Sequence, residues 1–195
     1  MASIIKVDDV QDAAGNNIIN ESGDTITIGA SGDTITVPSG ATVNVAGTAT
    51  GQNYPAFQAH MNSDQGSISA DTYTKVVFDT EFYDTGSMFD TSLYRFTPTV
   101  AGKYFCYYTL GNSFSSGTPD DVRSRFYFNG SAAADLRSAQ FREYNGAGLA
   151  VVVTTHSNAV LTFNGSSDYV EVYGRGDGTP QFSADSYFGA YRIGA

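Results

Sequence analysis

The side chains that most often carry out chemistry in proteins are few in this sequence and lie far apart. Its two histidines, His60 and His156, and its single cysteine, Cys106, fall outside any metal-binding spacing. The sequence contains neither the Gly-x-Ser-x-Gly elbow of a serine hydrolase nor a phosphate-binding glycine loop. We therefore expect structural or surface roles for these residues, with Cys106 as a small buried hydrophobic side chain.

The aspartates of the expected turns are the remaining candidates for acid chemistry. They are Asp64, Asp71, Asp84, Asp90, Asp120, Asp121, Asp168, Asp177 and Asp185. Two of them at the right separation could hydrolyse a glycosidic bond, but the sequence brings no pair together. No dense calcium-binding loop stands out either, so a Ca²⁺ site is left open without assigned ligands. We expect no enzyme activity and no cofactor.

The tripeptide Arg175-Gly176-Asp177 is the one short motif with a familiar function. On an exposed loop of an animal extracellular protein it would indicate integrin binding. Three-residue matches arise often by chance, and we interpret this one as a flexible turn. No ligand is assigned to it.

Composition and charge exclude several classes of protein. Of 195 residues only 15% are charged, against about 25% in ordinary globular chains, and the net charge is −10. Nucleic-acid binding is not expected, because phosphate contacts need clustered Lys and Arg. No run approaches the ~20 apolar residues of a membrane helix. We expect no signal peptide, since the charged Lys6 comes before an apolar segment of the necessary length. Tyr and Phe without Trp favour strands.

A nine-residue near-repeat occurs close to the start of the chain. Gly-Asp-Thr-Ile-Thr-Ile at 23–28 returns as Gly-Asp-Thr-Ile-Thr-Val at 32–37 and more loosely as Gly-Ala-Thr-Val-Asn-Val at 40–45. Each copy predicts a turn and a short alternating strand with one apolar edge. The residues of that edge are Ile26, Ile28, Ile35, Val37, Val43 and Val45. The edge is too small a core for one chain, so we expect a stem wound from three chains; the alternative is an unstructured linker.

The strand pattern divides the chain into residues 1–50, an N-terminal anchor and stem, and residues 54–195. Within the first part, strands are expected at 4–10 and 18–19, around a turn at 14–17. Within the second, short strands recur between turn clusters and no helix is convincing, which is typical of a β-sandwich and fits a jelly roll. The expected strands are 56–61, 74–82, 94–98, 103–110, 123–128, 132–141, 148–155, 159–163, 169–174 and 187–193.

Residues 54–195 resemble the C1q/TNF-like jelly-roll family. The most specific segment is Phe-Asp-Thr-Ser-Leu-Tyr-Arg-Phe-Thr-Pro-Thr-Val-Ala-Gly-Lys-Tyr-Phe at 89–105, although the proline follows Thr97 directly. Phe-Tyr-Phe-Asn-Gly at 126–130 is similar to the family's Lys-Asn-Gly hairpin, with Phe128 in place of the lysine. Val-Glu-Val at 170–172 and Tyr-Phe-Gly at 187–189 are similar to its last strands. The resemblance implies a trimer of jelly rolls without catalysis, whose aromatic strands fill the core and the threefold interface.

The N-terminal residues resemble the corresponding segments of tailed-phage virion proteins, and no collagen repeat is present. We therefore expect a homotrimeric virion protein, a head decoration or head-fibre protein. It would dock on other virion proteins through Ile4, Ile5, Val7 and Val10 and project a jelly-roll knob. The alternative is a tail-fibre tip that recognises a host surface glycan or protein. For that contact the best candidates lie in the expected loop at 112–121, at Phe114, Asp120 and Asp121.

Overall fold

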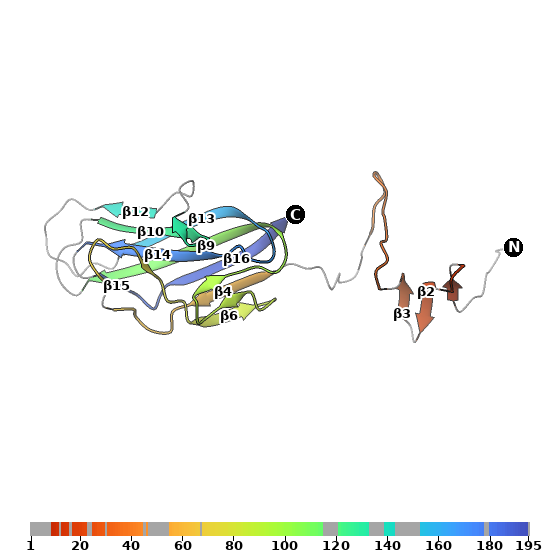
Figure 1. The fold of residues 1–195 in the computed structure, drawn as a ribbon, viewed down its shortest axis with the longest axis horizontal. Helices are drawn as coiled ribbons and strands as arrows, with labels where there is room; N and C mark the ends of the chain where they lie inside the picture. The colour runs from red at the N-terminus through yellow and green to blue at the C-terminus, as the bar shows by residue number, and fades with distance from the viewer. Residues whose placement is uncertain are drawn as a thin grey trace. The chain divides into compact units, whose positions relative to one another are not determined.

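The structure is a computed structural model of the whole chain, which divides into two compact units, Met1–Gly51 and Gln52–Ala195. It describes residues 9–11, 13–15, 17–22, 25–29, 31–44, 46, 55–66, 68–114, 121–132, 139–142, 153–177 and 180–194. Every regular element in these ranges is a β-strand (Figure 1). The described residues include no helix of the length and apolarity needed to cross a membrane.

The first unit contains a small antiparallel sheet in the order β1-β2-β3. Its strands are β1 (Asp9–Gln11), β2 (Asn17–Ser22) and β3 (Thr25–Ile28). Strand β3 is the first copy of the repeat, and its register pairs Ile28 with Ile19 and Thr25 with Ser22. The prediction of a strand is therefore confirmed for this copy.

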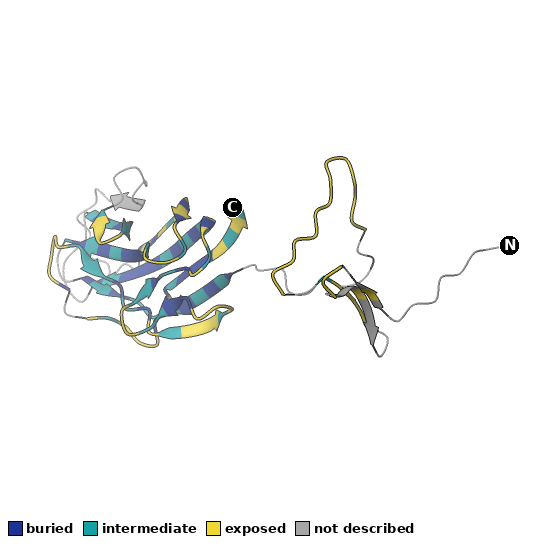
Figure 2. Cartoon of the chain, turned by 45° about the vertical axis from the view of Figure 1, so that its right-hand side comes forward, coloured by how far each residue is buried: buried dark blue, intermediate teal, exposed yellow. Residues whose placement is uncertain are grey.

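The prediction is wrong for the second copy and for the described part of the third. Residues 31–44 form no strand in the single chain, and all of them are exposed (Figure 2). A strand needs a neighbour to take up its backbone hydrogen bonds. Within this stretch residues 31–32 and 39–40 lie in turns instead, and the Ala41 amide donates to the Pro38 carbonyl at 3.0 Å across the second of them. Val45 lies outside the described residues.

The second unit is a sandwich of two antiparallel sheets. The first, the β9 sheet, runs in the order β13-β9-β16-β4-β6, with β15 paired to β9. Its strands are β4 (Ala56–His60), β6 (Thr80–Asp84), β9 (Gly102–Phe114), β13 (Val153–Phe163), β15 (Pro180–Phe182) and β16 (Tyr187–Gly194).

The second sheet, the β10 sheet, runs in the order β11-β10-β14-β8-β7, with β12 paired to β10 and β5 to β14. Its strands are β5 (Thr74–Lys75), β7 (Phe89–Asp90), β8 (Arg95–Phe96), β10 (Asp121–Phe128), β11 (Ser131–Ala132), β12 (Ala139–Arg142) and β14 (Val170–Gly176). The Asn129-Gly130 turn joins β10 to β11, and both residues have positive φ, as a tight two-residue hairpin requires.

The core between the sheets is built from the inward side of each alternating strand. Along β9, Tyr104, Cys106, Tyr108 and Leu110 are fully or almost fully buried, whereas the residues between them are only partly covered. Rings dominate this core because each one removes a large apolar area from water. The most completely buried of them are Tyr104, Tyr108, Phe57, Phe78, Phe96, Phe126, Phe163, Phe182 and Phe188.

Several expected strand boundaries are corrected. The strands expected at 148–155 and 159–163 belong to one strand, β13, which pairs with β9 from Val153 to Phe163. The strand expected at 74–82 is two, β5 and β6, which join different sheets. Polar residues at 156–158 produced the first error, since they continue the strand and do not form a turn: His156 and Asn158 are exposed, and Ser157 between them is half-buried.

Candidate functional site

The residues singled out for chemistry have structural surroundings. Cys106 is fully buried on the core side of β9, and this burial raises the pKa of its thiol. The ring of His60 stacks on Phe82 with centroids 4.2 Å apart, and His156 is exposed on β13. In the part of the chain that the structure describes, no three His, Cys, Asp or Glu side chains gather as metal ligands would.

Several of the aspartates hold turns through backbone amides. The carboxylate of Asp84 accepts hydrogen bonds from the amides of Met88 and Phe89, at 2.6 and 2.7 Å. Asp90 accepts from the hydroxyl and amide of Ser92 and from the amide of Leu93. These hydrogen bonds, led by that from the Ser92 hydroxyl, lower the pKa of Asp90. Both side chains therefore stabilise the loops around β7.

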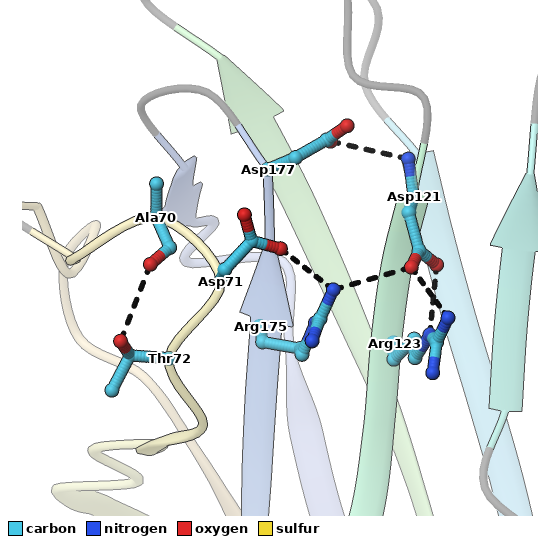
Figure 3. Close-up of polar contacts among 7 residues, drawn as sticks. All are labelled: Ala70, Asp71, Thr72, Asp121, Arg123, Arg175 and Asp177. Carbon is cyan, nitrogen blue, oxygen red and sulfur yellow. Dashed lines mark hydrogen bonds and ion pairs between the residues drawn. The ribbon is translucent and has the colours of Figure 1, made fainter.

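A cluster of ion pairs joins the loop before β5 to the ends of β10 and β14 (Figure 3). Arg175 contacts Asp71 at 2.7 Å and Asp121 at 3.2 Å, and Asp121 also holds Arg123 at 2.6 Å. The Asp121 amide in turn donates to the carboxylate of Asp177 at 3.1 Å. Asp121 thus links the start of β10 to the end of β14, although it was predicted as an outer-loop contact.

The Arg-Gly-Asp motif lies at the end of a strand, so the interpretation as a flexible turn is wrong for its first two residues. Arg175 and Gly176 belong to β14, and Gly176 is buried. A Cβ at Gly176 would lie 3.1 Å from the Phe114 ring, so the backbone of β14 packs closely against this ring.

The prediction that Phe114 lies in an outward loop is also wrong. Strand β9 continues to Phe114, which is 7% exposed and packs in a small second core with Val122 and Val153. Alternation along β9 carries this ring inward after Leu110 and Asn112. Asp120, the other candidate of that loop, lies outside the described residues.

The outer side of the β9 sheet presents a row of aromatic and apolar side chains, which we call the aromatic face. It consists of Tyr83, Phe105, Tyr107, Val160, Tyr187 and Tyr191. The register places Val160, Phe105 and Tyr191 side by side across three neighbouring strands. The rings of Phe105 and Tyr191 lie 5.4 Å apart, and Tyr191 is 45% exposed.

Tyr107 fixes the middle of the aromatic face. Its ring lies over Gly189 of β16, where a Cβ would come within 2.5 Å of the ring and of the hydroxyl. Burial under its neighbours, together with the hydroxyl of Tyr83 to which it hydrogen bonds, raises the pKa of Tyr107 to about 12. A glycine in a central strand therefore allows one tyrosine to lie flat across the sheet.

The outer side of the β10 sheet has a different character. The guanidinium of Arg125 lies 3.6 Å from the ring centre of Tyr73 and 5.1 Å from that of Tyr127. Tyr127 stacks on Tyr173 with centroids 3.8 Å apart. We call this group of Tyr73, Arg125, Tyr127 and Tyr173 the Tyr–Arg stack.

Ion pairs flank the Tyr–Arg stack. On one side Lys75 contacts the buried carboxylate of Glu171 at 2.6 Å. Burial and the neighbouring Glu171, to which it hydrogen bonds, raise the pKa of Tyr173 to about 12. On the other side lies the Asp121 cluster, where Arg175 is 5.9 Å from the ring centre of Tyr73.

The apolar residues predicted for the stem are exposed in the single chain. Ile26 is 68% and Ile35 63% exposed, and Ile28, Val37 and Val43 are exposed as well. Of the predicted docking residues, Val10 is exposed on β1, whereas Ile4, Ile5 and Val7 lie outside the described residues. The first unit thus leaves a series of apolar side chains uncovered.

Comparison with solved structures identifies the fold of the second unit. Two crystal structures of murine APRIL, at pH 8.0 and pH 5.0, match with TM-scores of 0.52 and 0.50 and with 12% and 11% identity. Each match covers 72% of this chain and 99% of the other. A structure of Eiger TNF from S. frugiperda matches with a TM-score of 0.49 at 15% identity, covering 72% and 91%.

The likeness to APRIL at this low identity shows the fold alone. The chain has a TNF-like jelly-roll fold, as its sequence predicted, and is all-β in the described residues. No protein-family model matches the sequence, and no curated protein does.

Sequence reasoning missed the Tyr–Arg stack. Its members come from the segment before β5, from β10 and from β14, so no single stretch of sequence contains them. A partial signal was present: in Asp-Val-Arg-Ser-Arg-Phe-Tyr at 121–127, strand alternation puts Arg123, Arg125 and Tyr127 on one face.

Proposed function

We propose that the chain is a homotrimeric virion structural protein of a tailed phage, a head decoration or head-fibre protein. Its N-terminal segment docks on other virion proteins, and its TNF-like jelly roll forms the projecting knob. The observation that carries the proposal is the amount of apolar surface that one chain leaves uncovered. The first unit exposes its apolar edge, and the second exposes the aromatic face.

Association of three copies would cover both surfaces. Contiguous exposed apolar surface on a protein marks a site of interaction, because burying it removes water from apolar area. The aromatic face lies across neighbouring strands of its sheet, and the resemblance to the C1q/TNF-like family implies a threefold interface built from aromatic strands. In the stem, each chain supplies one apolar edge, and three edges about an axis enclose a common core.

The virion assignment rests on the N-terminal segment, whose sequence resembles those of phage virion proteins. Ile4, Ile5, Val7 and Val10 are the proposed docking residues. A decoration protein binds empty capsids through residues 1–50, and a chain that lacks them does not bind. Binding by the truncated chain would contradict this part of the proposal.

Electron microscopy of whole phage particles labelled with gold-conjugated antibody against residues 54–195 tests the location. The proposal predicts label over the head. Label confined to the tail would instead support the second candidate, a receptor-binding tip, and particles without label would contradict the virion assignment.

The second candidate function is favoured by one observation, the Tyr–Arg stack on the outer side of the β10 sheet. This surface faces away from the core and from the aromatic face, because it belongs to the other sheet of the sandwich. A trimer formed through the aromatic face therefore leaves it free to meet a ligand.

A further inference from the structure

We propose that the Tyr–Arg stack binds an acidic polysaccharide, with Arg125 holding a carboxylate or sulfate group of a sugar unit. The inference depends only on the surface of the jelly roll and holds wherever the chain sits in a particle. It assigns a ligand chemistry to a surface that has no part in the proposed assembly.

The charge of Arg125 is held in place without being neutralised. Its guanidinium lies 3.6 Å from the ring centre of Tyr73 and 5.1 Å from that of Tyr127, and its Nη2 donates to the Tyr127 hydroxyl at 2.9 Å. Among the described residues, none of the ion pairs involves Arg125. Its Nε is buried and has no hydrogen-bond partner there. An immobilised cation without a carboxylate is therefore ready to accept an oxyanion.

The geometry of the stack determines the direction of approach. The Tyr73 ring lies 3.6 Å from the guanidinium and the Tyr127 hydroxyl accepts from Nη2, so an oxyanion can pair with the remaining N–H groups at the outer end of Arg125. The contact with the Tyr73 ring and the hydrogen bond to Tyr127 already hold Arg125, which reduces the conformational entropy that it loses on binding. This arrangement favours one oxyanion in a defined orientation.

The charges around the stack argue against a polyanion such as nucleic acid. The four cations Lys75, Arg123, Arg125 and Arg175 stand against four carboxylates, Asp71, Asp121, Glu171 and Asp177, so the surface has no excess of positive charge. Of these four cations, Arg125 is the one without an ion pair among the described residues. Binding of nucleic acid depends on many uncompensated cations, because affinity comes from neutralising successive phosphates. One uncompensated cation fits a ligand with isolated anionic groups.

The same ion pairs suit the hydroxyl groups of a sugar. Each sugar hydroxyl both donates and accepts, and the flanking Arg175–Asp71 pair supplies an Arg donor beside an exposed carboxylate acceptor. The tyrosine hydroxyls of the stack add groups of both kinds. An acidic peptide is disfavoured, since extended peptides bind at sheet edges or in grooves, whereas β10 and β14 pair with strands on both sides.

The test measures binding of the full-length chain to oligosaccharides by isothermal titration calorimetry. The probes are oligogalacturonate, a chondroitin sulfate oligosaccharide, neutral maltooligosaccharide and oligoglutamate. We expect the chain to bind at least one of the two acidic saccharides and not the neutral one, with an affinity that falls as salt is raised.

Arg125→Gln keeps a hydrogen-bonding group but removes the charge, and we expect it to weaken binding about tenfold or more. Arg125→Lys keeps the charge but loses the planar edge, so it should not restore the affinity. The matched control is Lys103→Gln on the β9 sheet, which removes the same charge from elsewhere and should leave binding unchanged. Thermal melting of each variant checks that the fold is intact.

Three results would overturn the proposal. The first is failure of both acidic saccharides to bind. The second is equal weakening by Arg125→Gln and Lys103→Gln, since this would show an effect of net charge alone. The third is equally tight binding of oligoglutamate with the same dependence on Arg125, which would assign the surface to acidic peptides.

Discussion

Replacement of Tyr191 by lysine perturbs the proposed threefold interface most directly. Tyr191 lies on the aromatic face, is 45% exposed in the single chain and contacts the ring of Phe105. Because half of the side chain is already in water, Tyr191→Lys should leave the jelly roll folded. In the trimer, by contrast, it places a charge where three chains meet.

The size of the effect follows from the exposed area. A buried tyrosine removes roughly 150–250 Å² from water, so a 45% exposed one leaves about 90 Å² for an interface to cover. At about 25 cal/mol per Å² this gives ~2 kcal/mol per copy and ~7 kcal/mol per trimer when the interface covers it fully. The association constant should therefore fall roughly 10⁴- to 10⁵-fold, and desolvation of the lysine lowers it further.

Size-exclusion chromatography with light scattering measures the outcome at micromolar concentration. The matched control is Leu93→Lys, which introduces the same charge at a residue that is 43% exposed in the turn between β7 and β8 of the other sheet. Tyr191→Lys should elute as a 20.7 kDa monomer, whereas Leu93→Lys should behave as wild type. A trimeric Tyr191→Lys variant, or equal dissociation of both variants, would refute the assignment of the interface.

Three further predictions test the stem, the core and the tyrosines. In the stem, Ile35→Asp should weaken the trimer while leaving the melting temperature of the jelly roll unchanged. The control is Thr34→Asp at the exposed neighbouring residue, which should leave the mass of the trimer in solution unchanged. Equal dissociation of the two variants would contradict an apolar edge. In the core, Gly174→Ala brings a Cβ within 2.6 Å of Leu110 and 2.7 Å of Phe182, and should lower the free energy of unfolding by about 1–3 kcal/mol. Gly66→Ala is the control, since nothing lies within 4 Å of its Cβ, and similar losses in denaturant titration would argue against the described packing. The raised pKa of Tyr107, about 12 against 10 for a free tyrosine, means that the folded chain binds this proton more tightly. The stabilisation that this proton contributes is therefore complete at pH values below the tyrosine pKa of the unfolded chain. It is lost as the pH rises toward the pKa of Tyr107 in the folded chain. Tyr107→Phe should make unfolding in denaturant less dependent on pH above about pH 10, and an unchanged dependence would contradict the burial of this hydroxyl.

The sequence was sufficient to predict the jelly roll because inward and outward residues alternate on its strands. Along β9 the alternation from Tyr104 to Leu110 is unbroken, and the segment at 89–105 carried the family resemblance. Boundaries were less predictable where consecutive polar residues lie within a continuous strand, as at 156–158 in β13. Tertiary pairing decides such positions, and local residue type does not.

The candidate sites were harder to predict than the fold, because they depend on which strands become neighbours. Phe114 was assigned to a loop since small polar residues surround it, yet pairing with β13 and β15 carries β9 further than its sequence suggests. The stack of Arg125 on Tyr73 joins residues that are far apart in the chain. For the stem, the repeat predicted strands that require partner chains, so the single chain leaves 31–44 without strands.

Sedimentation equilibrium of the full-length wild-type chain measures the assembly that would cover both exposed apolar surfaces. A homotrimer gives a single species of about 62 kDa at micromolar concentration, three times the 20.7 kDa of one chain. A monomer of 20.7 kDa under the same conditions would contradict it, because one chain leaves its stem residues and its aromatic face in water.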